Sequence, residues 1–116
     1  MREVAIVGVG IHKFGRFPEK PYTQIGLEAV AMALKDANIA WKDVQVAYCS
    51  RMYLPALTGL KTLTQLGRTG IPIVDVEAAC AGGVASLGQA CLAVGSGAYD
   101  VALALGVEKM PRGFME

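Results

Sequence analysis

Cys80 is the residue that is best suited to a chemical role, because of its side chain and its position in the sequence. It stands in Glu77-Ala-Ala-Cys-Ala-Gly-Gly83, a polarizable thiol among the smallest side chains available. Residues 73–78 before it are typical of a strand, and residues 80–97 after it of a helix. At such a turn, unpaired amides and the helix dipole favour the attacking thiolate. The pattern indicates a nucleophile, and a small buried cysteine without chemistry fits the local sequence equally well.

The other two cysteines, Cys49 and Cys91, offer no paired chemistry. The sequence contains no CxxC pair and a single histidine, so we expect no metal site. If one helix holds both Cys80 and Cys91, they lie about 16 Å apart, far beyond disulfide reach. We expect free thiols in a reducing compartment, with Cys49 in a strand core and Cys91 packed in a helix.

Polar residues near the N-terminus show no catalytic pattern. His12, the only histidine, is expected to be a surface or loop-packing residue. Lys13 and Arg16 suit either a phosphate group or, more simply, a solvated loop. Gly8-Val-Gly10 follows an apolar run, as in dinucleotide sites, but Lys13 occupies the place of the third glycine and no helix follows directly.

Strand-like and helix-like segments alternate along the chain. The predicted strands are residues 3–9, 44–49, 73–78 and 99–105, and the predicted helices are 23–38, 57–67 and 80–97. This alternation predicts a layered α/β fold with a mostly parallel sheet. The last helix has one Gln and two Ser as its only polar side chains, so we expect it to be central and buried. Glu108 and Lys109 follow the last strand and are expected to form a surface pair.

The segment from Thr23 to near Asn38 has the periodicity of an amphipathic helix. Thr23 is a possible N-cap. The apolar positions that we expect to face the core are Leu27, Val30, Ala31 and Leu34.

Composition excludes several classes of function. The 116 residues suit a single domain, and 53% are hydrophobic before 14 glycines are counted, which is more than a small soluble domain needs. We expect a subunit interface or a missing remainder of the polypeptide to cover the excess apolar surface.

Net charge is +1 with no basic cluster, so nucleic acid is not an expected partner. The uncharged run 78–99 holds five glycines and does not resemble a membrane span, and residues 1–7 do not resemble a secretory signal, so we expect a cytoplasmic protein.

Residues 76–110, VEAACAGGVASLGQACLAVGSGAYDVALALGVEKM, resemble the nucleophile region of the thiolase superfamily. The opening REVAIVGVGIHKFGR and the end ALGVEKM are similar to the lipid-transfer, sterol-carrier-like branch of that family. The resemblance implies that residues 1–116 are a single partial N-terminal domain of a layered thiolase-like fold. It implies that Cys80 accepts an acyl group from a coenzyme A thioester, with its own amide in the oxyanion hole. It also implies that strand 73–78 pairs across a dimer interface.

Two departures and several absences limit what the resemblance implies. Glu77 stands where many thiolases have Asn, and Gly82 where they often have Ser. The histidines and second cysteine that thiolase chemistry needs lie in later segments of the family and are not in this sequence. We therefore expect the chain alone to be inactive, without a covalently bound cofactor, and to act as a homo-oligomer or with a complementing thiolase chain.

Three alternatives stay open beside the acyltransferase. In the first alternative, the chain is a non-catalytic subunit or dimer-core piece that needs a partner chain. In the second, it is an aldolase-like relative of the lipid-transfer branch, in which Cys80 takes no part in the chemistry. A cysteine hydrolase is least favoured, because no histidine follows Cys80.

Overall fold

The computed structural model describes residues 1–113, and within them three parallel strands form one sheet. The strands are β1 (Val46–Ser50), β2 (Ile73–Val76) and β3 (Ala102–Gly106), in the order β2-β1-β3. They confirm the predicted strands 44–49, 73–78 and 99–105, with shifted ends. The largely parallel sheet and the α/β class are confirmed as well.

The register brings the carboxyl ends of all three strands to one edge. Ser50 pairs with Val76 of β2 and with Gly106 of β3. One residue earlier, Cys49 pairs with Asp75 on one side. Loops that leave this edge are therefore the natural place for a site in a parallel sheet.

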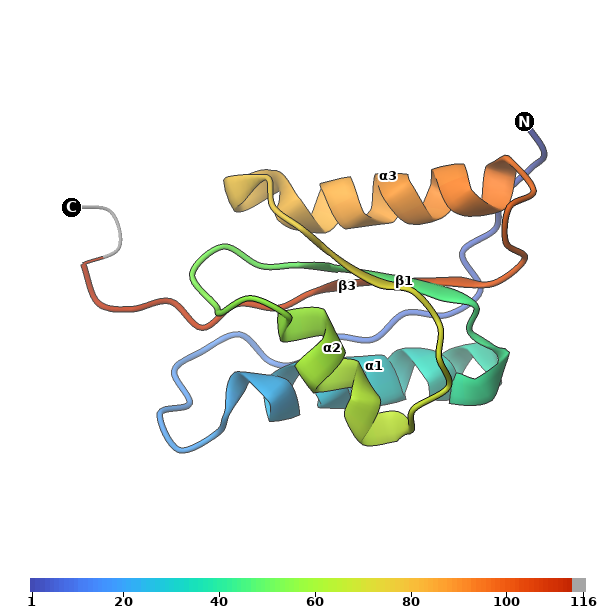
Figure 1. Cartoon of the computed structure of the whole chain (residues 1–116). Helices are drawn as coiled ribbons and strands as arrows, with labels where there is room; N and C mark the ends of the chain where they lie inside the picture. The colour runs from blue at the N-terminus through green and yellow to red at the C-terminus, as the bar shows by residue number, and fades with distance from the viewer. Residues whose placement is uncertain (114–116) are drawn as a thin grey trace.

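Helices cover both faces of the sheet, which gives three layers (Figure 1). On one face lie α1 (Tyr22–Ala37) and α2 (Thr58–Leu63), and on the other lies α3 (Gly82–Gly95). Short 3₁₀ turns flank them, namely η1 (Trp41–Asp43), η2 (Thr64–Leu66) and η3 (Ala79–Ala81). The predicted helix 57–67 is confirmed as α2 continued by η2.

The first helix follows its prediction, with two corrections. It begins at Tyr22, directly after Pro21, so Thr23 is not its N-cap. It ends at Ala37, next to the expected end, and the C-cap residue Asn38 closes it with a left-handed φ of 54°. Val30 is buried, but Ala31 is exposed, so the buried stripe is narrower than predicted.

The buried core lies between the sheet and the layer of α1 and α2. Its residues are Val30, Trp41, Val44, Ala47, Cys49, Leu54, Leu63, Leu105 and Val107. Hydrophobic burial of these side chains stabilises the packing of α1 and α2 on this face of the sheet.

The predicted strand at residues 3–9 is wrong. This segment is extended but pairs with no strand, and its apolar side chains are exposed instead of buried on both faces. In Figure 1 it runs alongside β3 between the sheet and α1. A strand needs a neighbour to pair with, and the sequence pattern alone does not supply one.

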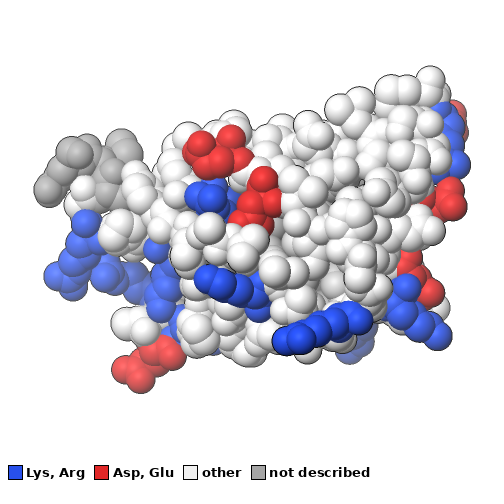
Figure 2. Space-filling model, in the orientation of Figure 1, with Lys and Arg blue, Asp and Glu red and all other residues white. Residues whose placement is uncertain are grey.

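The helix at 82–95 is only half covered, which corrects the expectation of a helix buried on all sides. Its inner face holds Gly82, Ser86, Ala90, Ala93 and Gly95. On its outer face Val84 is 75% exposed. No residue of α3 is charged, and the surface over the middle of the helix is white in Figure 2, between charged side chains at its two ends. Within the described residues no helix is long and apolar enough to cross a membrane.

Candidate active site around Cys80

Cys80 lies where the sequence predicted it, at the turn between a strand and a helix. It is the middle residue of η3, four residues after the end of β2 and two before the start of α3. Cys80 is exposed to solvent. A thiol in this position is open to a reagent from solvent and lies close to the amide-bearing end of α3.

The backbone of this turn is tightly fixed. Ala79 adopts φ 47°, a left-handed conformation that is strained for a residue with a Cβ. A Glu77 carboxylate oxygen accepts a hydrogen bond from the Ala79 amide at 2.9 Å, and the Ala81 amide donates to the Ala78 carbonyl at 3.0 Å. Glu77, one of the two departures from the thiolase pattern, therefore stabilises the turn that presents Cys80.

The other departure, Gly82, has a packing explanation. A Cβ at Gly82 would lie 2.9 Å from the Cβ of Ser50, closer than real Cβ atoms approach. A Cβ at Gly106 would lie 3.1 Å from the Ser50 hydroxyl oxygen. The first turn of α3 therefore sits directly on the carboxyl ends of β1 and β3, and Ser50 takes the space that a serine at position 82 would need.

Glu108 organises the loop that leaves β1 at the same edge of the sheet. Its Oε2 accepts hydrogen bonds from the Met52 amide at 2.7 Å and the Tyr53 amide at 3.0 Å. Lys109 instead donates to the carbonyl oxygen of Lys20 at 2.8 Å. The expected surface pair of Glu108 and Lys109 is therefore wrong. A charged residue directly after a parallel strand was the signal for a role at this edge.

Asp75 is a second carboxylate whose role the sequence did not reveal. It lies within β2, and its two oxygens accept hydrogen bonds from the amides of Thr58 at 3.0 Å and Gly59 at 2.9 Å. The Arg51 Nε lies 3.7 Å away. These contacts fix the N-terminus of α2 against the sheet.

His12 is a loop-packing residue, as predicted, and does not contact Cys80. Its Nδ1 donates to the Lys13 carbonyl at 2.7 Å, and its Nε2 lies 3.0 Å from both Lys20 Nζ and Glu28 Oε2. The Lys20 ammonium, followed by the Gln24 amide, lowers the pKa of the Glu28 carboxyl. The cluster ties the early loop to α1.

Of the other thiols, Cys49 lies in the strand core as predicted. It is fully buried in β1. Burial, followed by the nearby Asp75 carboxylate, raises the pKa of the Cys49 thiol to about 12. It is therefore protonated and inert at neutral pH. Cys91 is partly exposed on α3.

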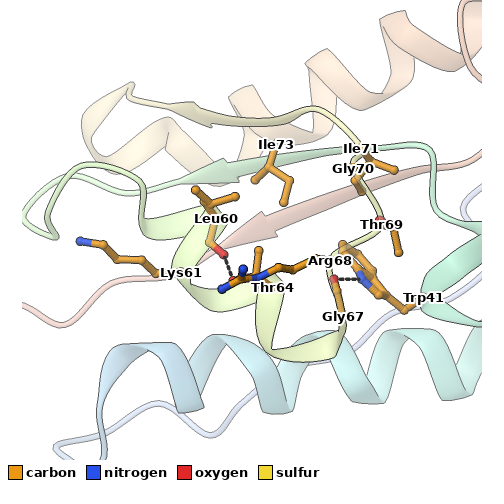
Figure 3. A pocket seen from close by; sticks show the side chains of 10 residues that line it. All are labelled: Trp41, Leu60, Lys61, Thr64, Gly67, Arg68, Thr69, Gly70, Ile71 and Ile73. Carbon is orange, nitrogen blue, oxygen red and sulfur yellow. Dashed lines mark hydrogen bonds between the residues drawn. The ribbon is translucent and has the colours of Figure 1, made fainter.

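A cavity that was a candidate for a site lies away from Cys80. It has a volume of about 340 Å³ and opens between α2, η2 and the loop before β2 (Figure 3). Leu60, Ile71 and Ile73 form apolar walls, and the indole Nε1 of Trp41 donates to the Gly67 carbonyl at 2.9 Å. No thiol or carboxylate lines this cavity, so it is not the place of the predicted chemistry.

Comparison with known proteins gives one family. The family described as "Thiolase, N-terminal domain" matches residues 4–114. An acetyl-CoA acetyltransferase of Methanocaldococcus jannaschii is 42% identical over 115 residues, which are 95% of this chain and 29% of that protein. The non-specific lipid-transfer protein-like 2 of Caenorhabditis elegans is 38% identical, over 98% of this chain and 28% of its own length. The chain thus spans less than a third of the length of these relatives.

Among solved structures, 3-oxoacyl-[acyl-carrier-protein] synthase III from Aquifex aeolicus has the same fold. It superposes with a TM-score of 0.75 and 24% identity, over 87% of this chain and 34% of that one. At this identity the likeness concerns the arrangement of helices and strands alone.

Proposed function

This chain belongs to the thiolase superfamily by its N-terminal domain, and from that premise we propose that it supplies the acyl-accepting cysteine of a thiolase-like acyltransferase. Cys80 is the proposed nucleophile, and an acyl thioester of coenzyme A is the proposed donor. The acyl group would then pass to a carbon nucleophile.

The proposed step is a thioester exchange. The Cys80 thiolate attacks the acyl carbonyl carbon, the tetrahedral intermediate collapses, and coenzyme A leaves as a thiolate while the acyl group stays on sulfur. The proton of the Cys80 thiol goes to a base, which later protonates the leaving thiolate. The Cys80 amide would donate to the oxygen that becomes negative.

One observation carries this proposal. The strained turn 78–81 holds Cys80 exposed, directly before the fourteen-residue helix α3. The positive φ of Ala79 is the kind of stored strain that concentrates at functional sites. Gly82 permits the close approach to Ser50 that fixes this helix start on the sheet.

The activating base would come from outside these residues. His12 is the one histidine of the sequence, and its ring is engaged by Lys20 and Glu28 on the α1 side of the sheet. We therefore propose that acyl transfer needs a complementing thiolase segment or chain. Within residues 1–113 β2 pairs with β1 alone, and its other edge suits the proposed dimer contact. The free thiols fit a reducing compartment, the cytoplasm.

A second candidate is a non-catalytic subunit that contributes only the core of a thiolase assembly. The uncharged, exposed outer face of α3 favours it, because such a surface suits a large subunit contact. In this case Cys80 would lie near the contact and carry no acyl group.

Acyl labelling separates the two candidates. The chain would be incubated with acetyl-CoA, alone and with a complementing thiolase fragment, and peptides would be mapped by mass spectrometry. In the complemented protein we expect one acetyl group on Cys80, lost in Cys80→Ser and kept in the control Cys91→Ser. Labelling that persists in Cys80→Ser removes Cys80 from this role. Absence of any acetyl-Cys80 in the complemented protein favours the non-catalytic subunit.

A further inference from the structure

The backbone amide of Cys80 has no acceptor, while the amides on either side of it are both hydrogen-bonded. The Ala79 amide donates to Oε1 of Glu77 at 2.9 Å. The Ala81 amide donates to the Ala78 carbonyl oxygen at 3.0 Å. Within the described part of the chain, the Cys80 amide donates to no protein group. Because Cys80 is exposed, this amide is free to donate to a ligand.

The pattern of bonded and unbonded amides depends on the conformation of Ala79. Its φ of 47° lies in the left-handed region, which costs free energy for a residue with a Cβ. Among the side chains of the described residues, that of Glu77 alone is hydrogen-bonded to the backbone of this turn. The Glu77 carboxylate therefore offsets part of the cost of the left-handed residue.

The end of β1 anchors both flanks of the turn. On the strand side, the Arg51 amide donates to the Val76 carbonyl oxygen at 3.2 Å. On the helix side, a Cβ at Gly82 would lie 2.9 Å from the Cβ of Ser50. Since both flanks are fixed to the sheet, the direction of the unbonded amide is decided within the turn itself.

Glu77 stands three residues before Cys80, so its carboxylate is also a candidate for the base that deprotonates the thiol. Its Oε1 is engaged by the backbone of Ala79, and within the described residues no hydrogen bond joins the carboxylate to the Cys80 sulfur. An ionised carboxylate accepts hydrogen bonds and donates none, so it does not stabilise a negative oxygen directly. These contacts favour a role in shaping the turn.

We propose that Glu77 is a positioning residue for the acyl-accepting step. By holding the Ala79 amide, it keeps the turn in a conformation that leaves the Cys80 amide unbonded, ready to donate to the acyl oxygen as that oxygen becomes negative. The inference rests on the proposed acyl chemistry of Cys80 and adds the group that directs its amide. It predicts that Glu77 affects acylation of the thiol and leaves its alkylation unchanged.

Two reagents, applied to the 116-residue chain, separate this role from general support of the fold. With p-nitrophenyl acetate, the thiolate attacks the carbonyl carbon, a negative oxygen forms, and p-nitrophenolate leaves as the acetyl group stays on sulfur. With iodoacetamide, the thiolate displaces iodide from carbon and no negative oxygen forms. The ratio of the two rates therefore reports on stabilisation of that oxygen. Peptide mass spectrometry in a Cys91→Ser background assigns both products to Cys80.

Glu77→Ala should lower the acetylation rate of Cys80 by at least about tenfold and change its alkylation rate by less than about twofold. Glu77→Gln keeps an acceptor oxygen, so its acetylation rate should lie between those of the original chain and Glu77→Ala. In Glu77→Ala the hydrogen exchange of the Ala79 amide should accelerate by at least about tenfold. Glu77 is exposed, so we expect the variant to fold. Glu77→Leu, which also lacks an acceptor oxygen, repeats the test if it does not.

A substitution at Ala79 tests the conformational step. Glycine adopts a positive φ without the penalty of a Cβ, so the turn in Ala79→Gly depends less on the Glu77 carboxylate. Adding Glu77→Ala to Ala79→Gly should therefore slow acetylation by a smaller factor than Glu77→Ala does in the original chain. Urea unfolding of each variant checks that the fold is kept.

Several results would overturn the proposal. An unchanged acetylation rate in Glu77→Ala, or an equal loss of acetylation and alkylation, would remove the positioning role. Equal losses in Glu77→Gln and Glu77→Ala would make the negative charge responsible, and equal losses with and without Ala79→Gly would separate Glu77 from the conformation of Ala79. Failure of the proposed function gives a different result. In that case no acetyl-Cys80 forms from acetyl-CoA in the complemented protein, while the ratio of the two rates still falls in Glu77→Ala.

Discussion

The Asp75 carboxylate caps the N-terminus of α2 from the neighbouring strand, with its Oδ2 3.0 Å from the amide nitrogen of Thr58. Helix α2 has no side-chain cap of its own, because its N-cap residue is Leu57 in a left-handed conformation, φ 65°. Capping therefore reaches across space from β2 and couples a short helix to the sheet.

Asp75→Ala should destabilise the fold. It leaves the amides of Thr58 and Gly59 without acceptors and Arg51 without its carboxylate, for a loss of about 2–3 kcal/mol in the free energy of unfolding. Asp75→Asn keeps an acceptor oxygen and should lose less. Urea unfolding of the three proteins measures both values. Equal stability of Asp75→Ala and the original chain would show that the cap contributes nothing.

Glu108→Ala should loosen the loop after β1 more than it destabilises the whole fold. The Met52 amide loses an acceptor at 2.7 Å, so its hydrogen exchange should accelerate by at least about tenfold. Glu108→Gln, which retains a neutral acceptor, should give an intermediate rate. Slow exchange in the core residue Leu63 serves as the control for an intact fold. An unchanged Met52 rate in Glu108→Ala would remove this role from the carboxylate.

The elements around Cys80 were predictable because their signals are local. Alternating side chains in residues 73–78 predict β2, and the long uncharged run that follows the small residues around Cys80 predicts α3. Residues 3–9 carry the same kind of signal, yet a strand forms only when a neighbour offers hydrogen bonds, and that is a property of other segments. Local patterns therefore identify which residues are able to form strands, and pairing decides which do.

The hydrogen-bond partners of Glu108 and Asp75 were not predictable for the same reason. The Glu108 carboxylate bonds to an amide 56 residues earlier in the sequence. The Asp75 carboxylate bonds to an amide 17 residues earlier. Neither spacing belongs to a capping box or any other local motif. The prediction for the outer face of α3 was wrong for another reason. The sequence pattern predicts an apolar helix, but it does not show which part of the described residues would cover each face, and the apolar side chains of the outer face are exposed.

Gly82→Ala should destabilise the fold by about 1–3 kcal/mol, because the new Cβ meets the Ser50 Cβ at 2.9 Å. Its matched control is the next residue, Gly83, where a Cβ would meet nothing within 4 Å. Gly83→Ala should be neutral or stabilise the helix by up to about 1 kcal/mol.

A double substitution shows whether the contact with Ser50 is the cause. Adding Ser50→Gly removes the side chain that the new Cβ meets, so the two changes together should destabilise less than the sum of their separate effects. Thermal or urea unfolding of the four proteins completes the cycle. Strict additivity would place the strain of Gly82→Ala somewhere other than Ser50.

Cys49 should make the fold sensitive to alkaline pH. Its pKa is raised from about 9.0 to about 12 by burial and by Asp75, so the folded state keeps the thiol proton that the unfolded state loses. A raised folded pKa contributes stability that is complete below about pH 9 and is lost as pH rises towards 12. The free energy of unfolding, measured in urea, should therefore fall more steeply between pH 9 and pH 12 for the original chain than for Cys49→Ala. Cys91→Ala, which removes a partly exposed thiol, should keep the steep slope. Identical slopes for all three proteins would mean that the Cys49 thiol ionises in the folded state as easily as in the unfolded one.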